Sequence, residues 1–327
     1  MQTLRAIPFL CYGFFEFTSP GFVRHSRYFK EGALDVDLTG RHYVCTGSSK
    51  GLGYATALEL AKRGGHVHLM CRNEEGGKIA KESIEQECNG AQNVTVHICD
   101  MSEVGQVHQL ATKFLDNNGR VDCLINNCGT MCKEYAETSE KVEKTLATNV
   151  LSGYVLTETF REELEKRNGR AIMVSSGGLL TENLITDDLE AKEVLEQGWD
   201  GRSVYARTKR QQVALTEYFA EKYKNNDVFY ASMHPGWADT PGVRKSMKTF
   251  YEKMKDRLRT TKEGADTIVW LAASEEALEY PGGSFFFDRK PAAQHLPLAG
   301  TYYDDMQRNR FVENMRKLLK EKCKLAF

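Results

Sequence analysis

Residues 205–209 read Tyr-Ala-Arg-Thr-Lys and place a phenol and an ammonium four residues apart. The surrounding apolar residues have the spacing of an amphipathic helix over about 203–225, so Tyr205 and Lys209 lie on one helix face. An ammonium beside a phenol stabilises the phenolate, and the lowered pKa lets Tyr205 exchange protons with a substrate oxygen. The same pair also occurs on ordinary half-buried helices, so the proton-transfer interpretation needs support from the rest of the chain.

A glycine-rich turn, Thr-Gly-Ser-Ser-Lys-Gly-Leu-Gly at 46–53, stands between an expected strand and an expected helix. Glycines allow a tight turn and a close approach of the backbone to a ligand. A helix that begins there offers unpaired N–H groups and a positive dipole end to a pyrophosphate. The turn therefore predicts a dinucleotide site that includes Gly47, Ser49, Lys50, Gly51, Leu52 and Gly53.

The second expected strand ends at Cys71 and is followed by Arg72 and Asn73. An enzyme that uses NAD normally has an acidic residue at this strand end, which binds the ribose 2′-hydroxyl. Here the acid is missing, and the guanidinium of Arg72 suits a 2′-phosphate, with Lys50 able to approach the same group. This favours NADP(H) as the cofactor, although Arg72 could also be a solvated loop residue.

Apolar, β-branched runs alternate with helical patterns from about residue 40 onward. The runs predict strands at 41–46, 66–71, 94–99, 121–127, 170–176, 228–235 and 283–288. The patterns between them predict helices at 53–64, 78–88, 104–117, 140–167, 203–225 and 262–274. This alternation is typical of an α/β fold, so we expect a single doubly wound Rossmann-type domain over 38–290 whose parallel sheet is flanked by helices.

Two extensions flank this domain: an aromatic N-terminal arm (1–37) and a C-terminal extension (291–327) with a terminal amphipathic helix. Residues 4–22 of the arm carry apolar residues at helical spacing. They predict a helix that either lies in a membrane interface or docks on the protein's own surface. No apolar run approaches the roughly 20 residues that cross a bilayer.

The overall composition excludes several classes of protein. The chain is 41% hydrophobic and 27% charged with a net charge of -1, which gives no reason to expect a nucleic acid partner. Its nine cysteines form no CxxC pair and no zinc-spaced cluster with histidine, so we expect reduced thiols and no metal site. These features indicate a cytoplasmic protein, peripheral to a membrane if the arm lies on one.

Six motifs occur in a characteristic order along the chain. They are Thr46–Gly53, Asn-Asn-Cys-Gly at 126–129, Asn149, the strand end at Ser176, Tyr205 with Lys209, and His-Pro-Gly-Trp-Ala-Asp-Thr at 234–240. Together they resemble the short-chain dehydrogenase/reductase superfamily over residues 38–290, and within it the retinol-dehydrogenase-like branch. Segments 209–217, 233–244, 285–291 and 295–299 carry a closer resemblance, to one group related to that branch, which extends over nearly the whole chain.

The resemblance implies four catalytic residues. Tyr205 would act as the acid or base, and Lys209 would lower its pKa and bind the nicotinamide ribose. Ser176 would hold the substrate oxygen; its neighbour Ser175 points to the opposite face of the strand. Asn149 would hold a water that links Lys209 to solvent.

The resemblance also implies further cofactor contacts. Asp100, with Met101 beside it, would meet the adenine. The adenosine ribose would lie beside Asn127, Cys128 and Gly129, where Cys128 replaces the usual alanine without changing the size of the site much. The nicotinamide ring would be oriented by Pro235, Gly236, Trp237 and Thr240.

These inferences predict an NADP(H)-dependent enzyme that interconverts a carbonyl and an alcohol on a small, apolar substrate such as a retinoid, steroid, fatty aldehyde or quinone. Segment 179–203 would be an insert that shapes one wall of the substrate cleft, and segment 241–262 a lid opposite. The alternative is an NADPH-binding scaffold or sensor with little turnover, which meets a membrane or partner through its arm. A homodimer is a further expectation, through helices that the terminal extensions could cover.

Overall fold

The computed structural model describes residues 2–117 and 119–327, within which eight strands form one sheet in the order β3-β2-β1-β4-β5-β6-β7-β8. The strands are β1 His42–Thr46, β2 His66–Cys71, β3 Val94–Ile98, β4 Cys123–Asn126, β5 Arg170–Val174, β6 Phe229–Met233, β7 Phe285–Phe287 and β8 Lys290–Pro291. All neighbours pair in parallel except β7 and β8. The predicted parallel sheet is confirmed; the short antiparallel edge strand β8 was not predicted.

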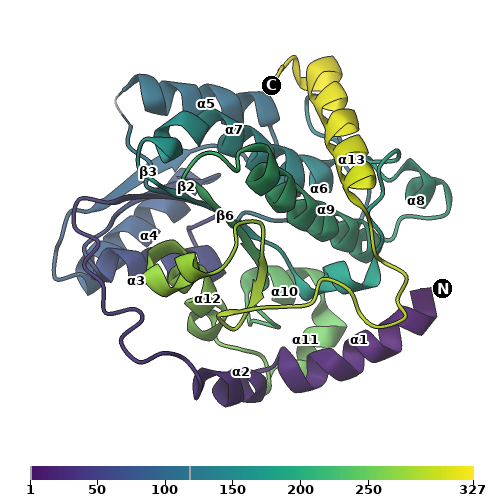
Figure 1. Ribbon diagram of the computed structural model, residues 1–327, viewed down its shortest axis with the longest axis horizontal. Coiled ribbons are helices and arrows are strands. Elements are labelled where there is room, and N and C mark those ends of the chain that lie inside the picture. Colours follow the sequence, from purple (N-terminus) through teal and green to yellow (C-terminus); the bar gives the residue numbers. More distant parts are fainter. Residues whose placement is uncertain (1, 118) are drawn as a thin grey trace.

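Helices cover both faces of the sheet (Figure 1). One face packs against α3 Gly51–Lys62, α4 Glu74–Glu87 and α12 Thr261–Ala273, and the other against α5 Val104–Asp116, α7 Ser152–Glu165 and α9 Gly201–Lys222. Each layer encloses its own cluster of buried apolar side chains, because strands buried on both faces carry apolar residues on both faces. The doubly wound α/β architecture is therefore confirmed.

The predicted helix over 140–167 is interrupted. It begins only at α6 Lys144–Leu146, passes through a π-helical turn at Ala147–Leu151 and continues as α7. A π turn holds one more residue than an α turn and often lies at functional sites. Asn149 lies in this turn.

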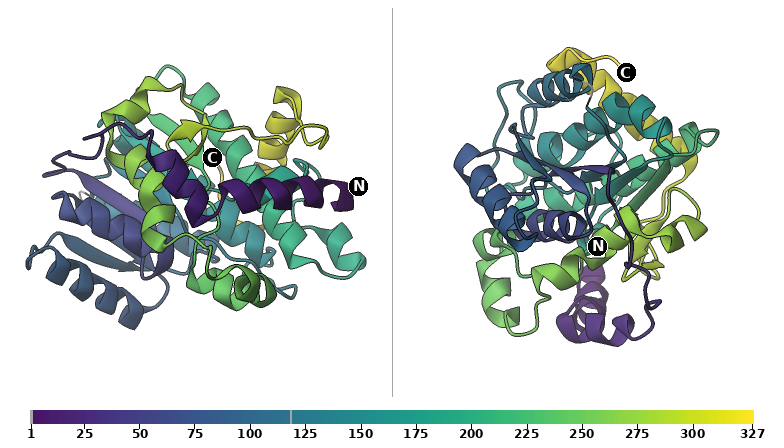
Figure 2. Two further views of the ribbon diagram at one scale, coloured as in Figure 1. Left: turned by 90° about the horizontal axis from the view of Figure 1, so that it is seen from below. Right: turned by 90° about the vertical axis from the view of Figure 1, so that its left-hand side faces the viewer.

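The N-terminal arm consists of α1 Gln2–Glu16 and α2 Ser19–Ser26 and lies against the domain beside two short helices, α10 Pro241–Ser246 and α11 Lys248–Met254 (Figures 1 and 2). Between α1 and α2, the Phe17 side chain is fully buried. The structure therefore agrees with the interpretation that the arm docks on the protein's own surface, for the face of α1 that lies against the domain.

The insert and the C-terminal extension complete the fold. The insert contains a 3₁₀ helix, η2 Gly177–Thr181, and α8 Lys192–Glu196; another 3₁₀ helix, η3 Glu275–Glu279, follows α12. The predicted terminal helix is α13 Asp305–Leu318, continued by the π-helical turn η4 Leu319–Cys323. Its apolar face belongs to the main core, since Phe311, Val312, Met315 and Leu319 are buried with α5, α7 and α9.

A row of histidines crosses β1, β2 and β3 on the α5 side of the sheet. His42 Nδ1 lies 3.0 Å from His68 Nε2, and His68 Nδ1 lies 3.1 Å from His97 Nε2. The Phe114 ring covers His68 edge-on at 4.9 Å. Burial lowers the pKa of all three imidazoles, and that of His68 falls to about 3.

Candidate active site

The candidate site lies at the carboxyl ends of β1, β4, β5 and β6, where loops converge at the point at which the strand order reverses. Thr46, the last residue of β1, joins two of these loops. Its Oγ1 accepts hydrogen bonds from the backbone N–H groups of Asn127 (3.0 Å) and Cys128 (2.9 Å). In return, Asn127 Nδ2 donates to the Thr46 carbonyl at 2.8 Å. The glycine turn and the Asn-Asn-Cys-Gly segment are thereby held in one rigid unit.

The glycine turn fits a dinucleotide phosphate. Gly47 and Gly51 both have a φ of +65°, a conformation that favours glycine. A Cβ atom on Gly53 would lie 2.5 Å from Asn127 Nδ2 and 2.6 Å from the Gly47 carbonyl oxygen. Helix α3 begins at Gly51 without a side-chain cap, so its first N–H groups point toward the turn unpaired by a capping side chain. A side chain at Gly53 would therefore collide with the backbone and side chain that hold the turn in place.

At the end of β2, the predicted cofactor residues have different surroundings. The Arg72 side chain is 71% exposed, and its Nη1 lies 4.0 Å from Asp100 Oδ2. An exposed ion pair at this distance contributes little free energy, so the Arg72 guanidinium is available to a ligand. Asn73 caps α4, because its Oδ1 accepts from Gly76 N at 2.7 Å. Asp100 Oδ1 accepts from the Ser102 N–H and hydroxyl, and Met101 is buried.

Tyr205, Ser176 and Lys209 meet as predicted. Lys209 Nζ lies 5.3 Å from the centre of the Tyr205 ring and donates to the Val174 carbonyl at 2.8 Å. Burial raises the pKa of Tyr205 to about 12, and a hydrogen bond with the Ser176 hydroxyl opposes this shift. Burial also lowers the pKa of Lys209 to about 7.

These two pKa shifts differ from the expected tuning of Tyr205 by Lys209. We expected Lys209 to lower the pKa of Tyr205, but an ammonium whose pKa is near 7 is only partly charged at neutral pH. Its stabilisation of a phenolate is correspondingly weak, and burial dominates the pKa of the phenol. In the protein alone, Tyr205 is thus a protonated donor.

The two serines after β5 have separate surroundings. The Ser175 hydroxyl is buried and donates to the Lys209 carbonyl at 2.8 Å, so it holds α9 against the strand. Ser176 caps the η2 helix, where its Oγ accepts from Gly178 N at 3.3 Å, and it faces Tyr205. This geometry agrees with the choice of Ser176 as the residue beside the substrate.

Gln212 was missed by the sequence reasoning. Its Oε1 accepts a 2.9 Å hydrogen bond from Lys209 Nζ, while its Nε2 donates to the Asn149 carbonyl at 2.7 Å. Gln212 thus bridges Lys209 and the Asn149 backbone, while a water held by Asn149 stays a prediction. Gln212 follows Lys209 by three residues on the same helix face, which is the signal that could have identified it.

The Asn149 side chain fixes the loop beside it. Its Oδ1 accepts from Thr130 N at 2.7 Å, and its Nδ2 donates to the Thr130 carbonyl and to Thr208 Oγ1. A Cβ atom on Gly129 would lie 3.3 Å from Lys209 Nζ and 3.5 Å from Asn149 Oδ1. Cys128 borders the same space, and burial raises its pKa to about 11, which makes it an unreactive thiol.

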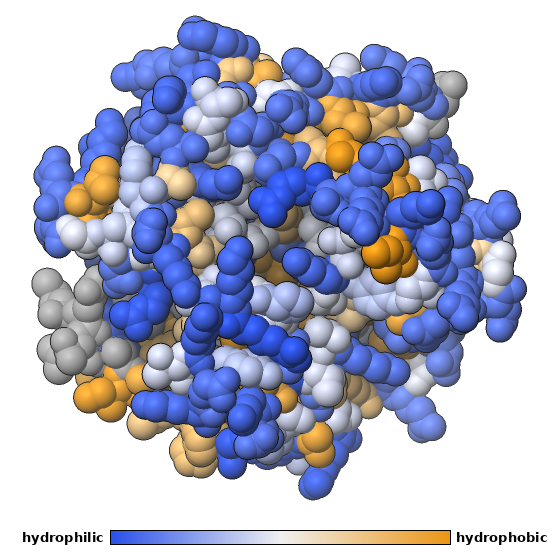
Figure 3. Space-filling model, turned by 180° about the vertical axis from the view of Figure 1, so that it is seen from behind, coloured by the Kyte–Doolittle hydropathy of each residue, from blue (hydrophilic) through white to orange (hydrophobic). Residues whose placement is uncertain are grey.

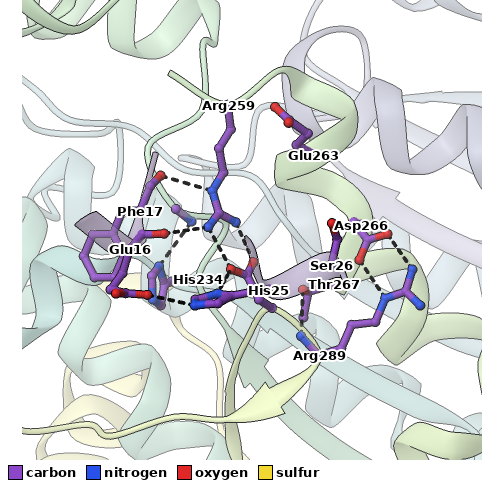
Figure 4. A network of polar contacts seen from close by, with 12 residues as sticks. Glu16, Phe17, His25, Ser26, His234, Arg259, Glu263, Asp266, Thr267 and Arg289 are labelled. Atoms are coloured by element: carbon purple, nitrogen blue, oxygen red, sulfur yellow. Dashed lines mark hydrogen bonds and ion pairs between the residues drawn. The ribbon is translucent and has the colours of Figure 1, made fainter. Parts of the chain in front are cut away.

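The segment expected to face the nicotinamide is held by the N-terminal arm (Figure 4). Trp237 N donates to the Phe17 carbonyl at 2.7 Å, and Gly236 has a φ of +72°. The buried guanidinium of Arg259 donates to the Phe17 carbonyl at 3.1 Å and the Glu16 carbonyl at 2.9 Å. It also pairs with both carboxylate oxygens of Asp288, at 2.5 and 2.8 Å.

The arm is therefore part of the site. This could not be predicted from the sequence, because the arm is far from the site residues along the chain. The Phe17 ring packs edge-on against Trp237 and Phe287, and a Cβ atom on Gly177 would lie 2.7 Å from it. Gly177 directly follows Ser176. Of the remaining predicted residues, Pro235 lies just after the end of β6. Thr240 caps α10, because its Oγ1 accepts a hydrogen bond from Val243 N.

The insert and the lid contact neighbouring residues of one loop. Trp199 Nε1 of the insert donates to the Cys132 carbonyl at 3.1 Å, and Ser246 Oγ of the lid lies 3.5 Å from the Met131 carbonyl. The C-terminal extension holds the insert from outside. Lys322 Nζ lies 2.6 and 2.8 Å from the two carboxylate oxygens of Glu190.

Across 2–117 and 119–327, no three His, Cys, Asp or Glu side chains are grouped in a way that could hold a metal ion. Over the same ranges, no helix has both the length and the apolar character needed to cross a membrane.

Comparisons with known proteins agree with this geometry. A family model described as short chain dehydrogenase matches residues 41–183. Dehydrogenase/reductase SDR family member 12 of Homo sapiens is 40% identical over 319 residues, which cover 97% of this chain and 98% of that protein. Retinol dehydrogenase 11 of Homo sapiens is 31% identical over 256 residues, covering 77% of this chain and 79% of that protein.

A solved structure of a protein from Mycobacterium paratuberculosis shares the fold, with a TM-score of 0.68 and 23% identity, and covers 90% of this chain and 98% of that chain. The resemblance predicted from the motifs is confirmed, and so is its extension over nearly the whole chain.

Proposed function

Because the chain belongs to the short-chain dehydrogenase/reductase family, and is an oxidoreductase, we propose that it interconverts a carbonyl and an alcohol with NADP(H) as cofactor. The observation that carries this proposal is the convergence of Tyr205, Ser176 and Lys209 beside the glycine turn. A nicotinamide cofactor, when bound, supplies or accepts the hydride.

The side chains would manage the substrate oxygen and its proton. Ser176 would hydrogen-bond to the substrate oxygen, and Tyr205 would donate a proton to it as the carbonyl is reduced. A pKa of about 12 keeps the phenol protonated at neutral pH, which suits an acid in the reducing direction. Lys209, whose pKa is near 7, would return a proton to Tyr205, and Gln212 would hold its ammonium toward Asn149.

The cofactor preference rests on the end of β2. The exposed guanidinium of Arg72 stands where an acidic residue would otherwise bind a ribose 2′-hydroxyl, and Lys50 is exposed at the start of α3. Gly47, Gly51 and Gly53 would accommodate the pyrophosphate. Asn127, Gly129 and the segment from Pro235 to Thr240 would border the remainder of the cofactor.

An apolar substrate is supported mainly by the relatives, which include retinol dehydrogenases at 31% identity. In the segment after Ser176, Leu179 and Leu180 are buried in one cluster with Phe17 and Val213. Trp199 remains at the wall formed by the insert, where its ring packs against Tyr135.

Oligomer and location are also proposals. α13 crosses α9 and α7, through contacts of Arg308 with Glu221 and of Arg316 with the Tyr154 hydroxyl. A homodimer of this chain would therefore pair through another face. The free thiols of the chain suit a reducing compartment such as the cytoplasm.

The test is NADPH oxidation against a panel of retinal, steroid ketones, fatty aldehydes and quinones, with Tyr205→Phe measured in parallel. We expect turnover of one class and a loss of at least 100-fold in the Phe variant with unchanged NADPH affinity, since only the acid is removed. If NADPH binds and no compound is reduced, the alternative of a cofactor-binding scaffold replaces the proposal. Turnover that survives in Tyr205→Phe would refute the assigned acid.

A further inference from the structure

Helix α1 is apolar on two opposite faces. The inner face docks on the domain, where Phe9 packs against Trp237, as does Phe17 just after the helix. The outer face presents Ile7, Leu10, Cys11, Phe14 and Phe15, which follow one another at the three- and four-residue spacing of a helical stripe. A helix that is apolar all round is normally buried on all sides.

The outer stripe is largely exposed to solvent. Ile7 is 64% exposed, Leu10 51% and Phe15 63%, and Phe14 lies beside them at 38%. Figure 3 shows hydrophobic side chains along the lower edge of the molecule. Single exposed apolar residues are common, but a continuous stripe of this kind marks an interaction surface.

The neighbouring lid carries an excess of positive charge. Segment 241–257 holds six exposed basic residues, Arg244, Lys245, Lys248, Lys253, Lys255 and Arg257, against two acidic ones, Glu252 and Asp256. The formal sum is +4, although the whole chain has a net charge of -1. Within the described part of the chain, Lys245, Lys248 and Lys253 have no acidic partner within 4.0 Å, whereas Arg244 and Lys255 are paired.

The stripe and the basic segment form one surface. The Arg257 guanidinium lies 4.4 Å from the centre of the Phe14 ring, and the Arg257 carbonyl accepts a hydrogen bond from Ser19 N at 2.9 Å. Figure 2 shows α1 and the lid helices α10 and α11 side by side at the same end of the molecule. An apolar helix face flanked by lysines is the pattern that binds at the interface of an anionic bilayer.

We propose that the outer face of α1, together with the basic lid segment, docks on the surface of a membrane that contains anionic phospholipids. α1 would lie in the plane of the interface with its stripe among the lipid headgroups and acyl chains, while the lysines meet the phosphates. The unpaired lysines favour an anionic lipid surface over a second copy of this chain, whose matching surface would carry the same positive charge.

Docking would also affect the site, and this consequence rests on the proposed function. The inner face of α1 contacts Trp237 and the backbone beside Ser176, and the lid borders the cleft. The bilayer would therefore lie against the cleft wall, where an apolar substrate dissolved in lipid could reach the site without crossing water.

The test is co-sedimentation of the full chain with vesicles of phosphatidylcholine, with and without phosphatidylserine, at low and high salt. We expect binding to the phosphatidylserine vesicles that weakens at high salt. The double variant Ile7→Glu, Phe15→Glu should lose at least 10-fold in binding. The matched control Ile79→Glu, an exposed apolar residue on α4, should bind as the wild type does.

The charge contribution has its own variants. Lys248→Gln with Lys253→Gln should weaken binding to phosphatidylserine vesicles by about 5-fold per lysine, since each contributes ~1 kcal/mol near an anionic surface. The control Lys78→Gln on α4 should have no effect. All these positions are exposed, so unchanged thermal unfolding and NADPH affinity would show that the fold and the cofactor site are intact.

Three outcomes would overturn the proposal. The first is that the wild type does not bind phosphatidylserine vesicles, and the second is that the stripe and control variants lose vesicle binding equally. The third is that the wild type is a dimer in sedimentation velocity and Phe15→Glu converts it to a monomer. The last would assign the stripe to contact between copies. NADPH turnover, measured on the same samples without vesicles, tests the proposed reaction separately.

Discussion

Replacing Gln212 with leucine should slow the chemical step while leaving cofactor binding nearly unchanged. The change removes the 2.9 Å hydrogen bond from Lys209 Nζ and the 2.7 Å bond to the Asn149 carbonyl. A hydrogen bond to a charged group contributes about 1.5–3 kcal/mol. If that loss appears in the transition state, kcat falls by about 10- to 150-fold, because each 1.36 kcal/mol is a factor of ten.

Gln211→Leu is the matched control. Gln211 is the neighbouring residue on α9, is equally buried, and its Oε1 has no hydrogen-bond partner within the described residues. The measurements are kcat, KM and the Kd of NADPH for both variants, together with the pH profile of kcat. We expect Gln212→Leu to lower kcat and shift the profile, and Gln211→Leu to change neither. Equal effects of the two substitutions would refute the relay and leave only a packing role for Gln212.

Two further predictions concern the cofactor and the histidine row. Arg72→Asp should raise the Kd of NADPH by about 10- to 100-fold relative to that of NADH, since a charge-assisted contact with the 2′-phosphate becomes a repulsion. Titration of the variant with both cofactors measures this change, and unchanged selectivity would show that Arg72 is only solvated. His68 has a pKa of about 3 in the folded protein, against an ordinary value of 6.5. As the pH falls from 6.5 toward 3, the unfolded chain therefore binds a proton that the folded protein does not, and the free energy of unfolding decreases. At pH 5 the loss is ~2 kcal/mol, from 1.5 pH units at 1.36 kcal/mol each. Urea unfolding of His68→Leu should therefore fall less between pH 7 and 5 than that of the wild type, and identical falls would contradict the assignment.

The sheet and its catalytic edge could be predicted because their signals are local. Each central strand is a short apolar run, and β2 has the predicted bounds of 66–71. Tyr205 with Lys209 and the glycine turn at 46–53 need only neighbouring residues to be recognised. Helix ends were less predictable; α4, for instance, begins at Glu74 because Asn73 caps it, four residues before the apolar pattern starts.

The parts that could not be predicted depend on contacts between distant segments. The Arg259 and Asp288 pair binds the backbone at Glu16 and Phe17, more than 200 residues away in the chain. A Cβ atom on Gly13 would similarly lie 2.4 Å from the distant Trp237 ring, in addition to 2.9 Å from the nearby Phe17 ring. The raised pKa of Tyr205 in the protein alone could not be predicted either, since burial is a property of the folded surroundings.

The bond between Lys322 and Glu190 has a consequence for how the protein is made. A ribosome completes the glycine turn, Tyr205 and Lys209 long before residue 322, so the nucleotide site can form while the cleft wall at 179–203 is still unanchored. Asn314, which donates to the Thr186 carbonyl, is also made late. A premature stop just before α13 would therefore leave a protein that retains its catalytic residues, but whose main core lacks Phe311, Val312 and Met315 and whose substrate wall is loose. Quality-control chaperones would meet this chain as an aggregation-prone product rather than as a weakened enzyme.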